Sequence, residues 1–345
     1  MSGTFISPAD YPQPWERPTF DELMTCLRKL YIEPPVWSPA TSRKTIVENY
    51  ENSTRFRREV AAYLSTIISN NLRWIEDDDK KEAIWDEAGR RLSERCGRAG
   101  MGEITRRWPF ENRSSPFELV IREPPITGDS LGLKTWGSSY LMAQLLDQIA
   151  NGPLAHLFRS NRLVSSLNVL ELGSGTGLLG MAAAAMWQTE VVLSDLPDII
   201  ANLSFNAEGN RNTIEGFGGS VSSGPLTWGS AEGNDERFSR KNQFDIILVA
   251  DPLYDDDHPQ LLSSAIRDHL MITPDARVVV MVPQRDLTTK RLTSHFRSEM
   301  AKGPLPLVVL EEHSLFVHDD WDESEEAAEV MCWWAAFGLQ NCLRL

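Results

Sequence analysis

The spacing of apolar residues differs between the two ends of the chain. Within residues 1–115 apolar positions recur three or four residues apart, which is the spacing of an amphipathic helix rather than of a strand. The pattern predicts one helix over 53–75, whose apolar face holds Phe56, Val60, Leu64, Ile67 and Ile68. A second helix is predicted to begin at an N-cap, Asp79, and to end near Gly97 and Gly100. We therefore expect a helical N-terminal extension over residues 1–115.

From residue 167 onward the pattern changes to short β-branched runs that alternate with helical stretches. Such alternation is typical of βαβ units that build a mostly parallel sheet. Strands are predicted at 167–172, 190–195, 244–250, 276–282, 307–315 and 330–337, with a seventh between 219 and 228. The sequence therefore predicts an α/β domain over residues 116–345 with a seven-stranded, doubly wound sheet.

Composition and charge narrow the possible partners. The chain has 345 residues and a formal net charge of −15, so its field repels phosphate backbones and no direct nucleic-acid substrate is expected. No run approaches the ~20 apolar residues of a membrane span, and the N-terminal sequence lacks the pattern of a secretion signal. Four scattered cysteines suit reduced thiols. We expect a cytoplasmic protein without a membrane anchor.

A local basic run interrupts this acidic chain. It consists of Arg90, Arg91, Arg95, Arg98, Arg106, Arg107 and Arg113. These side chains either steer an acidic partner or form the solvated face of an amphipathic helix, and the second reading is the more common one.

A glycine-rich loop carries the clearest chemistry. The loop 173–177 reads Gly-Ser-Gly-Thr-Gly, follows a predicted strand and opens a predicted helix over 178–187. Position 178 is Leu, where the dinucleotide fingerprint requires glycine. Glu171 precedes the loop, and its carboxylate suits a cationic amino-acid group better than a pyrophosphate. Asp195 ends the next strand, where an acid accepts hydrogen bonds from ribose hydroxyls. These features indicate S-adenosylmethionine, and a glycine-rich turn without a ligand is the alternative.

Four blocks carry a resemblance to a known family. They read LKTWG at 133–137, ELGSGTG at 171–177, LTW at 226–228 and FDIILVADPLY at 244–254. In these blocks the chain resembles the seven-strand protein methyltransferases of family 16, and the last block contains the family's D-x-x-Y motif. The resemblance implies a Rossmann-like class I methyltransferase fold and an S-adenosylmethionine-dependent protein-lysine N-methyltransferase. The segment 127–139 is similar to fungal enzymes that methylate translation elongation factors, particularly elongation factor 2.

The resemblance also implies roles for individual residues. Trp136 would close over the methionine side of the cofactor, and Asp195 would hold the ribose. Asp251 would attract the incoming lysine ammonium, and Tyr254 would border the methyl-transfer channel with an aromatic face. The remaining implied cofactor contacts are Glu171, Gly173, Ser174, Gly175, Thr176, Gly177, Leu196, Trp228 and Ala250.

Other readings remain open on these residues. Trp136 and Trp228 would each be ordinary core residues if they stood alone. A small-molecule N- or O-methyltransferase would use the same fold, and Asp251 with Asp255, Asp256 and Asp257 would then suggest a magnesium site. A noncatalytic binding module is a third possibility. Consecutive acids cannot all face one ion, and the histidines lack ligand spacing, so no metal is expected.

Overall fold

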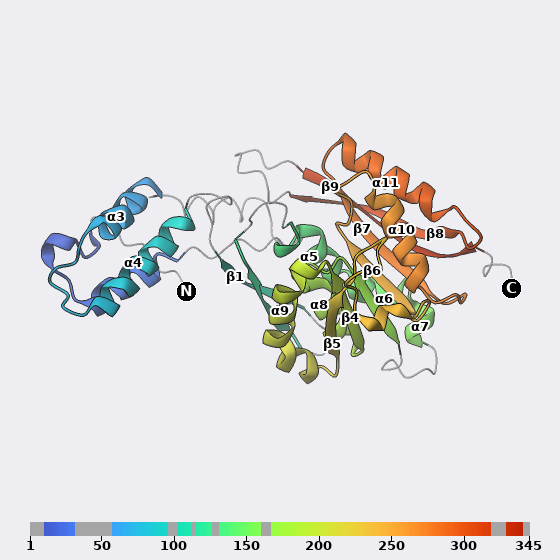
Figure 1. Cartoon of the computed structure of the whole chain (residues 1–345), viewed down its shortest axis with the longest axis horizontal. Coiled ribbons are helices and arrows are strands. Elements are labelled where there is room, and N and C mark those ends of the chain that lie inside the picture. Colours follow the sequence, from blue (N-terminus) through green and yellow to red (C-terminus); the bar gives the residue numbers. More distant parts are fainter. Residues whose placement is uncertain are drawn as a thin grey trace. The chain divides into compact units, whose positions relative to one another are not determined.

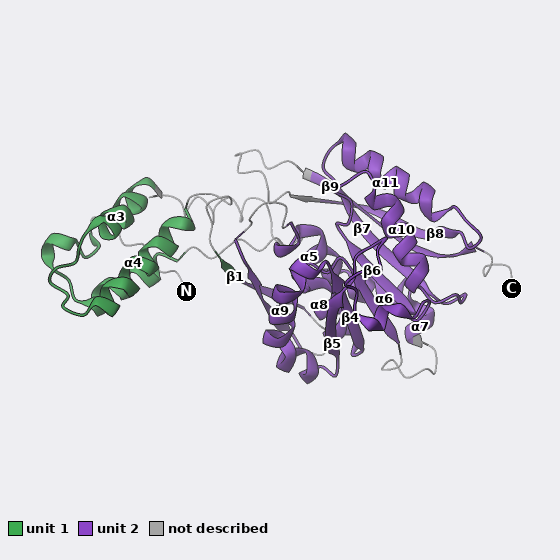
Figure 2. Ribbon diagram, viewed as in Figure 1, with its two compact units in different colours: residues 1–36, 40–104 green, residues 37–39, 105–345 purple. Residues whose placement is uncertain are grey.

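The chain forms two compact units. A computed structural model describes residues 10–31, 57–95, 103–111, 115–125, 131–159, 167–318 and 329–340. One unit comprises residues 1–36 and 40–104, and the other comprises 37–39 and 105–345 (Figure 2). This division falls between residues 104 and 105, at the start of a strand over 104–110, whereas the boundary predicted from the sequence is at residue 115.

The N-terminal unit is a small helical cluster with its own core. The helices among its described residues are α1 (Phe20–Lys29), α3 (Arg57–Ser69) and α4 (Asp78–Ser93), preceded by the short 3-10 helix η2 (Pro14–Glu16). Leu23, Leu64 and Ile84, one from each α-helix, are fully buried in this core. A capping box between Thr19 and Glu22 starts α1, which the sequence analysis did not predict.

Three details of the predicted helices are wrong. The N-cap of α4 is Asp77, whose carboxylate accepts from the backbone N–H groups of Asp79 and Lys80, and not Asp79 itself. The predicted helix over 53–75 ends at Ser69, and Ile68 is 38% exposed rather than part of the buried face. Residue Phe56 and the glycines at 97 and 100 lie outside the described residues.

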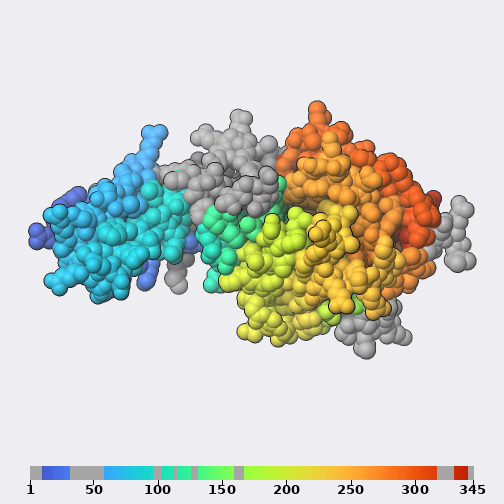
Figure 3. Space-filling view, viewed as in Figure 1, coloured from blue at the N-terminus to red at the C-terminus, as the bar shows by residue number. Residues whose placement is uncertain are grey.

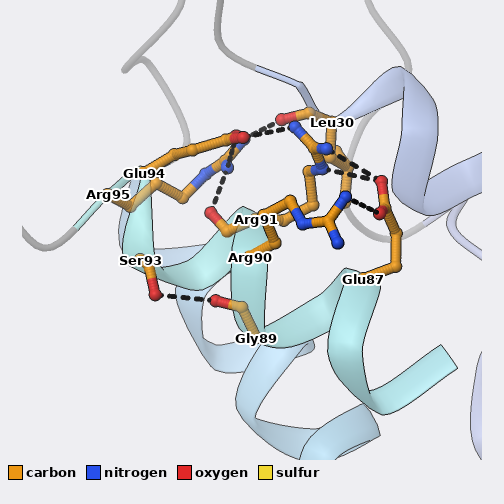
Figure 4. Close-up of polar contacts among 8 residues, drawn as sticks. All are labelled: Leu30, Glu87, Gly89, Arg90, Arg91, Ser93, Glu94 and Arg95. Atoms are coloured by element: carbon orange, nitrogen blue, oxygen red, sulfur yellow. Dashed lines mark hydrogen bonds and ion pairs between the residues drawn. The ribbon is translucent and has the colours of Figure 1, made fainter. Parts of the chain in front are cut away.

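Two arginines of the basic run, Arg91 and Arg95, are buried in the N-terminal unit, whereas Arg90 is exposed. The buried Arg91 pairs with Glu87 at 2.8 Å and also with Glu94 (Figure 4). The buried Arg95 donates to the carbonyls of Leu30 at 2.6 Å and Arg91 at 2.7 Å. Arg95 therefore joins the end of α4 to the end of α1. Because Arg91 and Arg95 are both buried, both expectations were wrong for these two side chains. Residues 98 and 113 of the run lie outside the described residues.

The second unit is built on a seven-stranded sheet with the order β5-β4-β3-β6-β7-β9-β8 (Figure 1). The first five strands in this order are parallel, and β9 runs antiparallel to both of its neighbours. The strands are β3 (Asn168–Leu172), β4 (Glu190–Asp195), β5 (Ser220–Pro225), β6 (Ile246–Ala250), β7 (Arg277–Gln284), β8 (Leu307–His318) and β9 (Glu329–Leu339). This arrangement confirms the predicted α/β class and the seven-stranded sheet.

Helices cover both faces of this sheet. Leu170 and Leu172 of β3 face a core that also contains Leu262 of α10 (His258–His269) and Phe296 of α11 (Leu287–Met300). The opposite face packs against α8 (Leu178–Trp187), where a Cβ added at Gly180 would lie 2.2 Å from Leu193. The other helical elements of the described residues are η4 (Leu131–Leu133), α5 (Gly137–Gln144), α6 (Leu146–Asn151), α7 (Ala155–Arg159), α9 (Pro197–Gly216) and η6 (Glu236–Ser239). Among the described residues no helix has the length and apolar character needed to cross a membrane.

A strand pair that the sequence analysis missed packs against α9. The strands β1 (Ile104–Phe110) and β2 (Phe117–Glu123) form a separate two-stranded sheet. Asn210 exchanges hydrogen bonds of 2.8 Å with both backbone groups of Val120, and Asn206 does so with Arg122 at 2.9 and 3.1 Å. The two side-chain amides thus replace a neighbouring strand on this part of β2. The opposite side of α9 (yellow-green) lies at the molecular surface (Figure 3).

Candidate active site

The glycine loop joins β3 to α8 through three residues with left-handed backbone geometry. Gly173, Gly175 and Gly177 have φ values of 69°, 56° and 88°. Side chains are disfavoured at such angles, which explains the glycine at each alternate position. A Cβ added at Gly177 would also lie 2.6 Å from Leu203 of α9. The loop is therefore a tight turn that only glycine fits without strain.

Hydrogen bonds hold this loop against the end of β4. The backbone N–H of Ser174 donates to the carbonyl of Ser194 at 2.9 Å, and the N–H of Ser194 donates to the Ser174 hydroxyl at 3.0 Å. Ser174 is buried. The Ser174 side chain therefore links the glycine loop to the end of β4.

The block 133–137 lies directly on the glycine loop. The hydroxyl oxygens of Thr135 and Thr176 are 2.7 Å apart and buried. The carbonyl oxygen of Gly132 would lie 3.1 Å from a Cβ added at Gly175. The block 133–137 and the glycine loop, which are far apart in the sequence, therefore pack directly against each other.

Glu171 points beneath the loop rather than toward its open side. Along β3, Leu170 and Leu172 face α10 and α11, so Glu171 faces α8. Its Oε2 accepts a hydrogen bond of 3.0 Å from the backbone N–H of Gly180. Burial raises the pKa of Glu171 to about 8, and the hydrogen bonds from Ser174 and Gly180 oppose that shift only in part. Contact between this carboxylate and a ligand cation stays a prediction.

Asp195 connects the end of β4 to the loop. Its Oδ2 accepts from the backbone N–H of Gly175 at 2.7 Å, and its Oδ1 accepts from that of Leu196 at 2.7 Å. Burial raises the pKa of Asp195 to about 6, while the two backbone hydrogen bonds favour the charged form. Each oxygen accepts one backbone hydrogen bond and keeps a second lone pair for a further donor such as a hydroxyl group. Leu196, at the start of α9, is 52% exposed.

Asp251 follows β6 in a conformation that is unusual for its type. Its φ is 53°, a left-handed geometry that costs a residue with a Cβ about 1 kcal/mol. Its backbone N–H donates to the carbonyl of Met281 in β7 at 2.9 Å. The side chain is buried and accepts two hydrogen bonds from the guanidinium of Arg285, at 2.8 and 3.3 Å. Burial raises the pKa of Asp251, and the charge of Arg285 opposes that shift.

This ion pair was not expected from the sequence. Arg285 occupies a position beside Asp251 at which a lysine ammonium was expected. Direct binding of a substrate ammonium to Asp251 stays a prediction. The Asp251 carboxylate already binds the guanidinium of Arg285. The signal that would have found Arg285 is its place directly after β7, since ligands of α/β sheets gather at the carboxyl ends of strands.

Aromatic rings form a series across the same edge of the sheet. The ring of Trp136 lies 5.9 Å from that of Tyr254, which lies 6.2 Å from the ring of His258. His258 in turn makes an edge contact with Trp228 at 6.0 Å. Trp228 packs against the loop, 3.5 Å from a Cβ added at Gly173. The structure therefore brings together all four of these side chains.

His258 lies between Tyr254 and Trp228 in this series. Its Nδ1 accepts a hydrogen bond of 3.1 Å from the backbone N–H of Tyr254, so it fixes the D-x-x-Y loop as well as packing between two aromatic rings. Ala250 ends β6, opposite Met281 of β7.

The acidic residues after Tyr254 do not converge. Asp256 pairs with Arg291 at 2.5 Å, and Asp255 accepts a hydrogen bond from the backbone N–H of Asp257. Within the described ranges, no three acids, histidines or cysteines are placed to share a metal ion.

Comparison with known proteins identifies relatives of this chain. The model of a family described as lysine methyltransferase matches residues 115–302. The protein-lysine N-methyltransferase rrg1 of Schizosaccharomyces pombe is 29% identical over 282 residues, which are 81% of this chain and 84% of rrg1. The protein-lysine N-methyltransferase EFM2 of Saccharomyces cerevisiae is 33% identical over 60% of this chain and 50% of its own length. A solved structure of a putative RNA methyltransferase from Pyrococcus horikoshii covers 62% of this chain and 90% of its own, at 14% identity and a TM-score of 0.40.

Proposed function

The chain belongs to the lysine methyltransferase family, and from this premise we propose that its substrate is a lysine of translation elongation factor 2. The family membership confirms the resemblance to protein-lysine methyltransferases and establishes S-adenosylmethionine as the methyl donor. The observation that carries the site assignment is the meeting of the glycine loop, Asp195 and the Asp251–Tyr254 loop at one edge of the sheet.

The donor is proposed to bind along the glycine loop. The left-handed glycines leave room for a ligand close to the backbone, and the Asp195 oxygens have lone pairs for the ribose hydroxyls. S-adenosylmethionine supplies a methyl group on a positively charged sulfur. The other residues proposed to contact it are Trp136, Glu171, Gly173, Ser174, Gly175, Thr176, Gly177, Leu196, Trp228 and Ala250.

The acceptor lysine is proposed to approach beside Trp136 and Tyr254, whose rings contact each other. Both rings present faces that attract cationic groups. Asp251 is buried and acts on Tyr254, and the Arg285 guanidinium that binds Asp251 also lies over Trp136. Methyl transfer is an in-line displacement, so these side chains have to orient the amine toward the methyl carbon rather than activate it covalently. Lysine has a reference pKa near ~10.4, so it must lose a proton before it reacts.

The choice of elongation factor 2 rests on sequence similarity. The segment 127–139 resembles fungal enzymes that methylate elongation factors, and the chain is 33% identical to EFM2 over 221 residues. That substrate implies a cytoplasmic enzyme.

Tritiated S-adenosylmethionine tests this proposal. Purified protein is incubated with the labelled donor and either a fungal cell extract or elongation factor 2 produced in bacteria. We expect one labelled band at the size of elongation factor 2, with strongly reduced label for Asp251→Asn. Asp256→Asn is the matched control, because it makes the same change in the same loop at an exposed residue.

Other outcomes would redirect the assignment. Label on a different protein would keep the lysine methyltransferase activity and reject this substrate. Label only in the small-molecule fraction would favour a small-molecule methyltransferase. Failure of the wild-type protein to bind the donor would favour a noncatalytic module.

A further inference from the structure

A closed network of buried hydrogen bonds begins and ends at the last two residues of β2. Glu123 accepts a hydrogen bond of 3.3 Å from the backbone N–H of Thr135. The hydroxyl oxygen of Thr135 lies 2.7 Å from that of Thr176 in the glycine loop. The side-chain amide of Asn206 donates to the Thr176 carbonyl at 3.1 Å and exchanges two hydrogen bonds with the backbone of Arg122. The network therefore returns to β2 at the residue next to Glu123.

The side chains of this network are almost completely shielded from solvent. Glu123, Thr135, Thr176 and Asn206 are 4%, 2%, 3% and 1% exposed, and Arg122 takes part through its backbone. Water cannot easily replace a partner that is lost from such a network, so the remaining group stays unsatisfied or the chain has to move. Each contact in the network therefore restricts the positions of the segments that it joins.

The network holds the glycine loop at two points of one residue. The hydroxyl of Thr176 contacts Thr135, and its carbonyl accepts from Asn206. The glycines of the loop permit the tight turn but have no side chains with which to anchor it. Thr176 directly follows Gly175, whose backbone N–H donates to Asp195 at 2.7 Å. Anchoring at Thr176 therefore helps to fix the loop relative to Asp195.

Thr135 is the residue that connects β2 to the loop. Its backbone N–H binds Glu123 while its hydroxyl contacts Thr176, so one residue bridges two elements. The buried Arg106 of β1 pairs with Glu123 at 3.6 Å, which holds the β2 end of this bridge. Thr135 also directly precedes Trp136, the residue before helix α5. The same short segment thus carries the anchor of the loop and the ring beside it.

We propose that Thr135 is a positioning residue of the donor site, whose hydroxyl group holds the glycine loop in the conformation that binds S-adenosylmethionine. The inference rests on the proposed function, since it concerns the proposed binding of the donor along this loop. A loop that is already ordered loses less conformational entropy when the donor binds, which raises the affinity. Thr135 acts through Thr176 rather than by contact with the donor.

The donor affinity of Thr135→Val tests this proposal. Valine lacks the hydroxyl, but its backbone N–H can still donate to Glu123. We expect equilibrium dialysis to give a Kd for S-adenosylmethionine that is about five- to tenfold higher than that of the wild type, the effect of one buried hydrogen bond. Thr135→Ser keeps a hydroxyl and should bind within about twofold of the wild type. Thr135→Ala should raise the Kd as Thr135→Val does, which gives a second test if the valine variant does not fold.

Thr189→Val is the matched control. Thr189 is also 2% exposed, and its hydroxyl donates to the carbonyl of Leu167 at 2.9 Å. It directly precedes β4, at the opposite end of that strand from Asp195. This change removes an equally buried hydroxyl and should leave the Kd of the donor unchanged. Without donor, amide hydrogen exchange over residues 173–177 should be faster in Thr135→Val than in the wild type, whereas exchange in β7 should be the same.

A double variant tests whether the effect passes through Thr176. If the contact between the two hydroxyl groups carries it, Thr135→Val should change the Kd little in a protein that already carries Thr176→Val. An equal increase in the Kd in both backgrounds would overturn the proposal, as would an equal increase for Thr189→Val. An unchanged Kd for Thr135→Val, with loop exchange as in the wild type, would also overturn it.

Failure of this inference can be distinguished from failure of the proposed donor site. If Gly177→Ala weakens donor binding and Thr135→Val does not, the donor site stands and the role of Thr135 is refuted. If the wild-type protein binds the donor and Gly177→Ala leaves the affinity unchanged, the donor does not bind along this loop and both proposals fail. If the wild-type protein binds no donor, the proposed function fails and this inference falls with it. None of these measurements needs a substrate protein, so the identity of the methylated protein does not affect them.

Discussion

Replacing Glu171 by Gln should make the stability of the donor-free protein less sensitive to pH. Glu171 is 2% exposed, and burial raises its pKa from 4.5 to about 8. Because the folded pKa is the higher one, this group favours folding fully below pH 4.5 and loses that contribution as the pH rises toward 8. The interval of about 3.5 pH units corresponds to at most about 5 kcal/mol of unfolding free energy.

The glutamine variant should therefore be the more stable protein at pH 8. Gln has nearly the shape of protonated Glu, and its side-chain oxygen can accept the same hydrogen bond from Gly180. We expect similar stability at about pH 5 and a difference of about 2–5 kcal/mol in favour of Glu171→Gln at about pH 8. Urea unfolding at the two pH values measures it. The control is Glu190→Gln, which makes the same change at an exposed residue at the start of β4.

An equal difference between wild type and variant at both pH values would refute this reasoning. It would mean that Glu171 is already ionised in the folded protein, so that burial does not dominate its environment. Adding S-adenosylmethionine gives a second readout. If the donor's ammonium contacts Glu171, as the sequence predicts, saturating donor should stabilise the wild type more than the variant at pH 8.

Three other substitutions test the architecture. Gly177→Ala places a Cβ on a residue with φ 88°, 2.6 Å from Leu203, so it should lower the free energy of unfolding by about 1–3 kcal/mol and weaken donor binding. Thermal denaturation and equilibrium dialysis measure the two effects. Unchanged affinity for the donor would contradict the conclusion that this turn requires glycine. Asn206→Leu removes the hydrogen bonds of this side chain to β2 and to the Thr176 carbonyl, so urea unfolding should show a loss of about 2–4 kcal/mol in the free energy of unfolding. An unchanged free energy would mean that these side-chain hydrogen bonds contribute little. Arg91→Met removes the closest cation from Glu87 and Glu94, so hydrogen exchange should quicken in α1 and α4 but not in β3. Equal quickening in both units would argue against separate cores.

Much of the second unit could be predicted because its signals are local. The strand predicted at 190–195 matches β4 residue for residue, and the loop 173–177 has left-handed geometry at each of its three glycines. Both features follow from the chain's own geometry, since β-branched runs favour strands and only glycine adopts these angles freely. The sequence also identified the family, because its motifs are short contiguous blocks.

Some local signals were present but were missed. The residues of β1 alternate between exposed and buried, as do those of β2. However, β1 lies in the range 1–115 that was read as helical, and no element was predicted over the residues of β2. Helix α9 carries asparagines at positions 202, 206 and 210, and that four-residue spacing marks one face of a helix. Nothing in the spacing shows that this face binds the backbone of a strand.

The sequence by itself determined the sheet, the glycine loop and the residues at the ends of its strands. Only the tertiary structure decided what those residues contact. It pairs Asp251 with Arg285 from a different strand, turns Glu171 under α8, and buries Arg91 and Arg95 although they belong to a basic run. The physical reason is that backbone preferences act over a few residues, whereas ion pairing and burial depend on which distant segments the order of the strands and helices brings together.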